Sequence, residues 1–305
     1  MTVADVLAIY GEEHAPHVAD PGRIGYAIDA LLPFWGELPV SAIRAETCRR
    51  YAADRKLPVY AQRRGKSKRR TVIGYKPASP GTVRKELATL QTALNYCQKN
   101  GYLLGAPIVT LPPRPETPQR SLTRSEAAKL IRAARSHGAH HVARFILIGL
   151  YTGTRRDAIL NLRLSGPSAV GGWFDIDKGL LYRRGEAERD SKKRRTPARV
   201  PRQLLAHARR WHARGLTWAV EWRGQRVGSI KTAWGKAVAA ARLGWSPTPH
   251  TLKHTAITWA IEAGVSITDA AGFFGTSAET IERVYWHKSP MFQQAALDAM
   301  ERRRK

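Results

Sequence analysis

The sequence contains little cysteine. Its two cysteines, Cys48 and Cys97, cannot form a disulfide framework, and they lack the spacing of metal ligands. Both lie in apolar patterns of helical spacing. We therefore expect reduced cysteines in the core of a cytosolic chain, and no structural metal.

Long apolar runs are also missing. The N-terminus has no basic segment followed by an apolar one, which argues against a secretory signal. No apolar stretch approaches the length of a membrane span. We therefore expect a cytoplasmic protein that does not associate with a membrane.

Acidic residues are few, since 24 Asp and Glu stand against 51 Lys and Arg, for a formal net charge of +27. A field of this sign attracts polyanions, and nucleic acid is the commonest soluble one. Composition alone is equally consistent with a basic ribosomal or chromatin protein that carries out no chemistry.

The first half of the chain has mostly helical patterns. We predict one helix over 43–57 and another from Pro80 to about Asn100-Gly101. The pattern is lost between Tyr60 and Pro77, where six of the eight residues from Arg63 to Arg70 are basic. Such a run is typical of a solvated loop and equally of a nucleic-acid contact. The candidate DNA-binding residues there are Arg63, Arg64, Lys66, Lys68 and Arg69.

Five prolines between Pro107 and Pro118 exclude a regular element and predict an extended connector. We therefore expect a helical core-type DNA-binding domain over 1–110, a linker over 111–120 and a second domain over 121–305.

The second domain has its own helix and strand signals. Thr123 and Glu126 have the spacing of a capping box, and helices are predicted to about Arg135 and from about His141 to Tyr151. Strand alternation between Trp173 and Arg184 predicts a hairpin, and a shorter one turns near Arg223-Gly224. The fold class is therefore mainly α with a small antiparallel β-sheet.

Four segments of this domain carry candidate chemistry. Arg155 follows a Thr-Gly turn, which alone is typical of a surface arginine after a helix. His250, Lys253 and His254 share one face of a helix. Zinc is disfavoured there because Thr251 stands where the metalloprotease pattern needs Glu, and no Cys or carboxylate cluster completes a site.

Tyr285 lies on the helix that follows Gly275, for which Thr276 and Glu279 predict a capping box. Such a tyrosine is ordinarily a residue at the edge of the core. A basic run from Arg189 to Arg195 follows the strand predicted near Leu180–Arg183, and is ordinarily a solvated hairpin tip.

Taken in order, these segments resemble the catalytic domain of the tyrosine recombinases, the phage integrase family. Thr-Gly-x-Arg resembles the first arginine box of the family, which gives that role to Arg155. His250 and Lys253 occupy the His and Arg positions of its His-x-Leu-Arg-His box. Tyr285, ten residues after Gly275, matches the spacing to the family's nucleophile. The resemblance covers roughly residues 120–290 strongly and the first 110 residues weakly.

The resemblance also implies a hairpin lysine. Lys193 stands eight residues before Pro201, as that lysine does in the family, and Lys192 is the alternative. The implied reaction is metal-free and ATP-free attack of Tyr285 on a phosphodiester, which leaves a 3′-phosphotyrosine. Arg155 would grip the phosphate, His250 would donate to it or exchange a proton with the tyrosine, and Lys193 would protonate the departing oxygen.

Three positions depart from the family pattern. Lys253 replaces the second arginine and so loses the bidentate fork. Thr276 replaces the usual His or Trp. Ala158 stands at the acidic position, with Asp157 beside it. His287 is a weak candidate for the missing donor.

The resemblance implies that the partner is double-stranded DNA and that the protein is associated with the nucleoid when it is bound to DNA. It also implies a homotetramer on two recombining sites, and it allows accessory DNA-bending proteins as further partners. The tail over 291–305 has the pattern of an amphipathic helix that could dock on a neighbouring copy. We expect recognition to stop at the core site, without a separate arm-binding domain. The alternatives are a type IB topoisomerase, which the length and the linker disfavour, and a non-catalytic DNA-binding or regulatory protein derived from a recombinase.

Overall fold

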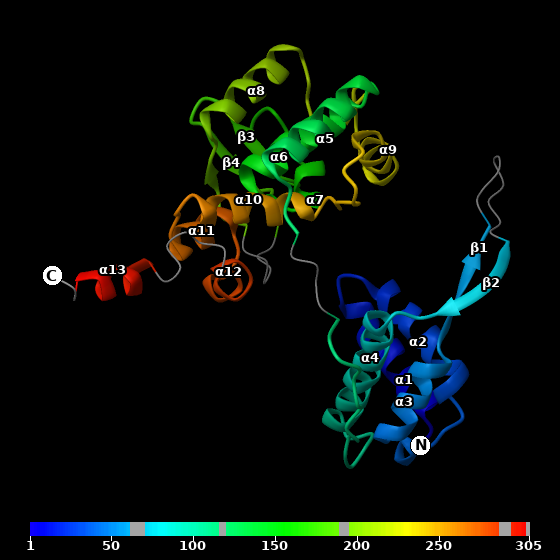
Figure 1. The fold of residues 1–305 in the computed structure, drawn as a ribbon. Coiled ribbons are helices and arrows are strands. Elements are labelled where there is room, and N and C mark those ends of the chain that lie inside the picture. Colours follow the sequence, from blue (N-terminus) through cyan, green and yellow to red (C-terminus); the bar gives the residue numbers. More distant parts are fainter. Residues whose placement is uncertain (62–70, 116–119, 189–194, 287–293, 303–305) are drawn as a thin grey trace. The chain divides into compact units, whose positions relative to one another are not determined.

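The computed structural model describes residues 1–61, 71–115, 120–188, 195–286 and 294–302. The chain divides into two compact units, Met1–Thr117 and Pro118–Lys305 (Figure 1). None of the helices in the described ranges is long and apolar enough to cross a membrane.

The first unit is mainly helical, and its helices pack around α4. They are α1 (Val3–Ile9), α2 (Pro21–Trp35), α3 (Ala45–Asp54) and α4 (Pro80–Lys99), with short helical turns at Tyr10–His14, Ala15–His17 and Val40–Ala42. Leu87, Leu90 and Leu94 of α4 are fully buried against residues of the other helices. Both cysteines are buried and unpaired in this core, as predicted.

The prediction for the segment after α3 is wrong in two respects. The helix expected over 43–57 ends at Asp54, and residues 56–77 include an antiparallel hairpin of β1 (Lys56–Tyr60) and β2 (Val72–Pro77). Both strands are rich in β-branched and aromatic residues, which favour extended backbone. Almost every position of the hairpin is half-buried or exposed, so no alternation of buried and exposed residues marked it in the sequence. The basic run over 63–70 lies outside the described residues.

A charged contact holds α3 against α4 at the base of this hairpin. Arg55 donates to both carboxylate oxygens of Glu86, with Nη2 to Oε1 at 3.0 Å and Nε to Oε2 at 3.1 Å. The Tyr51 hydroxyl donates to the same carboxylate at 2.7 Å. Because Glu86 is only 7% exposed, it depends on these donors to offset its lost hydration.

Replacing Glu86→Gln should therefore weaken the first unit. The Arg55 charge loses its partner, at a cost of about 2 kcal/mol. Amide hydrogen exchange in α3 and α4 should become faster, by about 30-fold where exchange requires opening of the unit. Glu46→Gln, an exposed change on α3, is the matched control and should leave exchange unaltered. Equal exchange in both variants would contradict a stabilising role for this contact.

The second unit contains most of the helices and two small antiparallel sheets. In chain order its elements are α5 (Arg124–Ser136), α6 (His140–Thr152), α7 (Arg156–Leu160), β3 (Trp173–Asp175), β4 (Leu180–Tyr182), β5 (Ala198–Arg199), α8 (Arg202–Ala213), β6 (Glu221–Trp222), β7 (Gln225–Arg226), α9 (Lys231–Ala241), α10 (Thr251–Glu262), α11 (Ile267–Phe274), α12 (Ala278–Tyr285) and α13 (Gln294–Arg302).

The predicted hairpins are confirmed. Strand β4 lies between β3 and β5, with Leu181 opposite Phe174 on one side and Ala198 on the other. Strands β6 and β7 turn at Arg223 and Gly224, which both have positive φ, as a two-residue hairpin turn requires. The chain is mainly helical with small antiparallel sheets, so the predicted fold class is confirmed.

Helix α6 passes through the main core of this unit. Phe145, Ile146 and Ile148 are fully buried there. The capping box of Thr123 and Glu126 starts α5 as predicted. A second, smaller core joins α10, α11 and α12, and Phe274 and Tyr285 belong to it. Helix α10 therefore contributes to both cores, with Leu252 in the first and Ala256 in the second.

Candidate active site

A turn at the end of α6 fixes the direction of Arg155. Helix α6 ends at Gly153, whose φ of +58° favours glycine. A Cβ atom on Gly153 would lie 2.4 Å from Phe274 Cδ1, so the turn also requires the absence of a side chain. Thr152 and Thr154 on either side are buried, and their hydroxyls lie 2.7 Å apart. Arg155, which follows this turn, has extended backbone and is the N-cap residue of α7.

Four cationic side chains surround a cavity of about 80 Å³ beside this turn. They are Arg155, Arg183, Arg195 and Lys253, and the remaining lining residues are Gly153, Thr154, Asp157, Ala158 and Phe274. Burial and the charge of Arg195 lower the pKa of Arg155. Burial, helped by Arg155, lowers the pKa of Arg183 to about 10. The cavity is therefore a small, strongly positive space.

Lys253 comes to this cavity from the first turn of α10. It is 6% exposed, and its Nζ donates to the Phe274 carbonyl at 2.9 Å. Burial, with the charges of Arg155 and Arg183, lowers its pKa to about 7. Much of the Lys253 population therefore carries no charge near neutral pH in the protein without a ligand.

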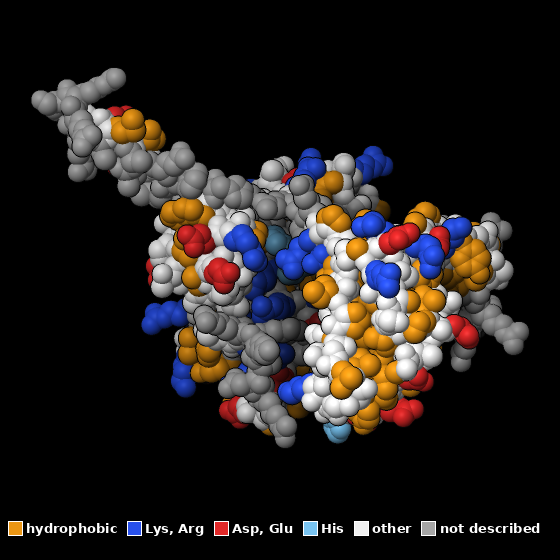
Figure 2. Space-filling model, turned by 90° about the horizontal axis from the view of Figure 1, so that it is seen from below, with side chains coloured by type: hydrophobic (Ala, Val, Ile, Leu, Met, Phe, Trp, Pro, Cys, Tyr) orange, Lys and Arg blue, Asp and Glu red, His pale blue; other side chains and the backbone are white. Residues whose placement is uncertain are grey.

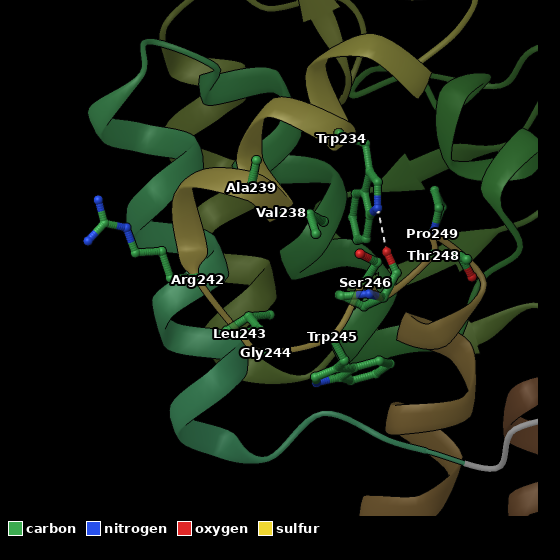
Figure 3. A pocket seen from close by; sticks show the side chains of 12 residues that line it. Trp234, Val238, Ala239, Arg242, Leu243, Gly244, Trp245, Ser246, Thr248 and Pro249 are labelled. Carbon is green, nitrogen blue, oxygen red and sulfur yellow. Dashed lines mark hydrogen bonds between the residues drawn. The ribbon is translucent and has the colours of Figure 1, made fainter.

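His250 immediately precedes α10, and partial desolvation, Lys253 and Arg155 lower its pKa. The segment before it lines an apolar pocket of about 570 Å³ between α9 and Pro249 (Figure 3). There the Trp234 Nε1 donates to the Pro247 carbonyl at 2.8 Å. Arg242 points away from this pocket (Figure 3). The hydrogen bond from Trp234 thus fixes the backbone that leads to His250, and no charged group points into this apolar pocket.

Tyr285 is the last residue of α12 and is 4% exposed. Its hydroxyl lies 2.5 Å from Nδ1 of His254, and the rings of His254 and His250 lie 4.7 Å apart, edge to face. Burial raises the pKa of Tyr285 far above its ordinary value. Ionisation of this tyrosine therefore needs a base in direct contact, and His254 is in that position.

The predicted cap of α12 is wrong by one residue. Ser277 caps the helix by accepting from the Thr280 amide, whereas the Thr276 amide donates back to Ala271 after the left-handed Gly275. The Thr276 hydroxyl is buried, and no partner for it lies among the described residues. Closing the end of α11 occupies Thr276 and shifts the cap to the next residue.

Of the catalytic candidates, the structure brings Arg155 and Lys253 to one cavity and places His250 within reach of their charges. Tyr285 connects to this group through His254. Several candidates lie outside the described residues: Lys193, Lys192, His287 and the basic run with Arg63, Arg64, Lys66, Lys68 and Arg69.

Three contributors were missed by the sequence reasoning. His254 was placed on the correct helix face, yet no role was assigned to it. Arg195 was treated only as part of a solvated basic run. Arg183 follows β4, and its burial depends on contacts between distant segments, which no local pattern reveals.

On the face seen in Figure 2, Lys and Arg side chains gather beside a histidine side chain.

Within the described ranges, no three His, Cys, Asp or Glu side chains are grouped so that they could hold a metal ion. The described site itself brings together fixed cations, two histidines and a tyrosine.

Replacing Gly153→Ala should displace the turn that carries Arg155. Its Cβ would meet the Phe274 ring, so the unfolding free energy should fall by about 1–3 kcal/mol more than strain at positive φ alone explains. Gly138→Ala is the matched control, since Gly138 has a φ of +68° and open space around its Cβ position. Calorimetry should show a second-unit transition lower in Gly153→Ala than in the control, by about 2–4 °C per kcal/mol. Equal transitions would contradict the close approach.

Comparison with known proteins places this geometry in context. No family model matches the chain. In sequence, it is 26% identical over 223 residues to the tyrosine recombinase XerC of Chlamydia caviae, a match that covers 68% of each protein.

Solved structures of two integrases have the same fold. The Tn1549 transposon integrase in complex with transposon right end DNA superimposes with a TM-score of 0.70 at 13% identity, covering 99% of this chain and all of that one. A lambda integrase dimer bound to a COC' core site gives a TM-score of 0.65 at 13% identity, over 94% of this chain and 77% of the other. A lambda integrase tetramer bound to a Holliday junction gives 0.63 at 15% identity, over 91% and 78%. The chain is thus similar in sequence to a tyrosine recombinase and has the fold of the transposon and phage integrases.

Proposed function

We propose that this protein is a site-specific DNA recombinase of a phage or another mobile element, and that it breaks and rejoins DNA through a 3′-phosphotyrosine on Tyr285. The observation that carries the proposal is the contact of the Tyr285 hydroxyl with His254, next to a cavity lined by cations. A tyrosine and its base beside a phosphate-sized positive space suit attack on a phosphodiester.

In the proposed step, the scissile phosphate lies in the cavity near Arg155 and Lys253. The Tyr285 oxygen forms a bond to phosphorus while the bond from phosphorus to the 5′ oxygen breaks. The tyrosine proton passes to His254, and the departing 5′ oxygen takes a proton, for which Lys193 is the candidate acid. Fixed cations favour this step because the transition state carries more negative charge on the phosphate oxygens than the ground state does.

The phosphotyrosine ester conserves the energy of the broken bond. Reversal by a 5′ hydroxyl of the same or another strand restores the DNA, so the reaction needs neither ATP nor a metal ion. The donor set of the described site agrees with this, because cations of the protein itself surround the cavity.

DNA binding in this proposal extends to the first unit. The basic run that joins β1 and β2 in the sequence would contact the phosphate backbone, and no acidic residue occurs between Arg55 and Lys85. Strand exchange between two sites requires several active copies on the DNA. A homotetramer is therefore the proposed active assembly, and a lambda integrase tetramer on a Holliday junction is a solved example of this fold.

A suicide substrate tests the reaction. On a duplex with the attachment site nicked next to the cleavage position, the wild type should accumulate protein covalently joined to DNA, because the short cleaved product diffuses away. Tyr285→Phe should form no adduct, whereas Tyr151→Phe, a change to a half-buried tyrosine of the same unit, should form it normally. If the wild type forms no adduct on its true site under any condition, the protein is a non-catalytic DNA-binding protein and the proposal fails.

The rate of adduct formation should depend on pH through Lys253. Its pKa of about 7 means that its charge is present at pH 6 and is lost as the pH rises through 7. Lys253→Arg keeps its charge, so the rate of this variant relative to wild type should rise by up to about 10-fold between pH 6 and pH 8 at subsaturating DNA. A ratio that stays constant or falls would contradict Lys253 as the weaker, titrating phosphate ligand.

A further inference from the structure

Arg183 directly follows β4 and is the one arginine among the described residues that is buried, with 4% of its surface exposed. Its guanidinium lies 5.9 Å from the centre of the Phe273 ring and lines the cationic cavity. The family resemblance assigns no role to this position.

The hydrogen-bond partners of Arg183 are all uncharged. Nε donates to the Thr154 hydroxyl at 3.1 Å, Nη1 to the Thr196 carbonyl at 2.8 Å and Nη2 to the Thr152 carbonyl at 2.9 Å. Two other arginines do have acidic partners, since Arg55 pairs with Glu86 and Arg195 with Glu188. Arg183 has no ion pair with any described carboxylate.

The charges nearest Arg183 have the same sign. Besides burial, the charge of Arg183 lowers the pKa of Lys253, and the charge of Arg155 lowers the pKa of Arg183. Asp157 lines the cavity too, but its side chain is 75% exposed and accepts from Arg156 Nε at 2.7 Å. Burying a cation among cations is costly unless an anion joins them. The arrangement of these described residues therefore favours an anionic ligand.

The size and the donors of the cavity indicate which anion fits. A volume of about 80 Å³ equals two to three water molecules at about 30 Å³ each, which suits one tetrahedral oxyanion. A guanidinium has five N–H donors, and the three bonds to protein leave one on each Nη nitrogen. Two such donors match two oxygens of one phosphate.

Lys253 does not offer this geometry. Its single ammonium group already donates to the Phe274 carbonyl, and it cannot present two parallel N–H bonds. Arg183 comes from a different part of the chain, yet it delivers a planar fork to the same cavity.

We propose that Arg183 is a second phosphate-binding guanidinium of the active site, which together with Arg155 holds the scissile phosphate in place of the arginine that Lys253 replaces. This proposal rests on the proposed recombinase function. Through Thr152 and Thr154, Arg183 also braces the turn that carries Arg155, so both guanidinium groups depend on one network.

Binding of inorganic phosphate tests the proposal without the DNA reaction. Phosphate should raise the melting temperature of the wild type relative to chloride at equal ionic strength. In Arg183→Gln the apparent affinity for phosphate from this shift should fall by about 10-fold or more. Arg199→Gln removes an exposed cation from the neighbouring strand β5 and should keep the wild-type response. An unchanged phosphate response in Arg183→Gln would overturn the proposal.

Adduct formation on the suicide substrate supplies the second readout. At saturating DNA, Arg183→Gln should slow the single-turnover rate by about 100-fold, as the loss of a transition-state donor does, with little change in DNA affinity. Arg183→Lys keeps the charge but lacks the planar fork, so its rate should lie between those of the wild type and Arg183→Gln. This variant also replaces Arg183→Gln in the test if Arg183→Gln does not fold. Thr154→Val, which removes the acceptor of Nε and the hydroxyl contact with Thr152 but keeps the guanidinium, should cost less than either. A rate in Arg183→Lys within threefold of the wild type, with an unchanged phosphate response, would overturn the proposal.

The two readouts separate this proposal from the proposed function. If phosphate binding depends on Arg183 while the wild type forms no adduct, the anion site stands and the recombinase function fails. If the wild type forms the adduct and neither readout depends on Arg183, the function stands and the role of Arg183 fails.

Discussion

Burial of like charge around one small cavity is the constraint on which the second unit depends. Arg155, Arg183, Arg195 and Lys253 reach this cavity from separate segments, and neither Arg183 nor Lys253 has an ion pair with a described acid. Mutual repulsion would disperse these side chains if their backbones were free. The left-handed Gly153 turn, the small sheet and the start of α10 prevent this, because each is fixed by packing or by buried hydrogen bonds.

The same constraint shapes the chemistry. Burial, together with Arg155 and Arg183, lowers the affinity of Lys253 for its proton, and low local dielectric strengthens the attraction for any phosphate that enters. The proposed nucleophile, Tyr285, is kept in the opposite condition, since it is buried and protonated beside His254. In the proposed reaction, the cations that stabilise the transition state and the base that takes the tyrosine proton thus lie in separate parts of the site, and a bound phosphodiester would contact both parts.

Local sequence patterns predicted part of this arrangement. The capped helices and the two hairpins of the second unit followed from spacing and turn residues, whereas the roles of Arg155, His250, Lys253 and Tyr285 followed from the family resemblance. The β1–β2 hairpin was missed because its strands are exposed on both sides and therefore lack alternation. Arg183 was missed because its burial depends on carbonyls at positions 152 and 196, and His254 because only the packing of α10 against α12 reveals its contact.

A direct NMR measurement of the Lys253 pKa tests the central claim that the site is a buried cationic cavity suited to a phosphate. The account predicts a pKa of about 7 in the free protein and a rise of more than about one unit when a DNA duplex binds, since an adjacent phosphate favours the charged form. A pKa near the ordinary lysine value of about 10.4 in the free protein, unchanged by DNA, would contradict it.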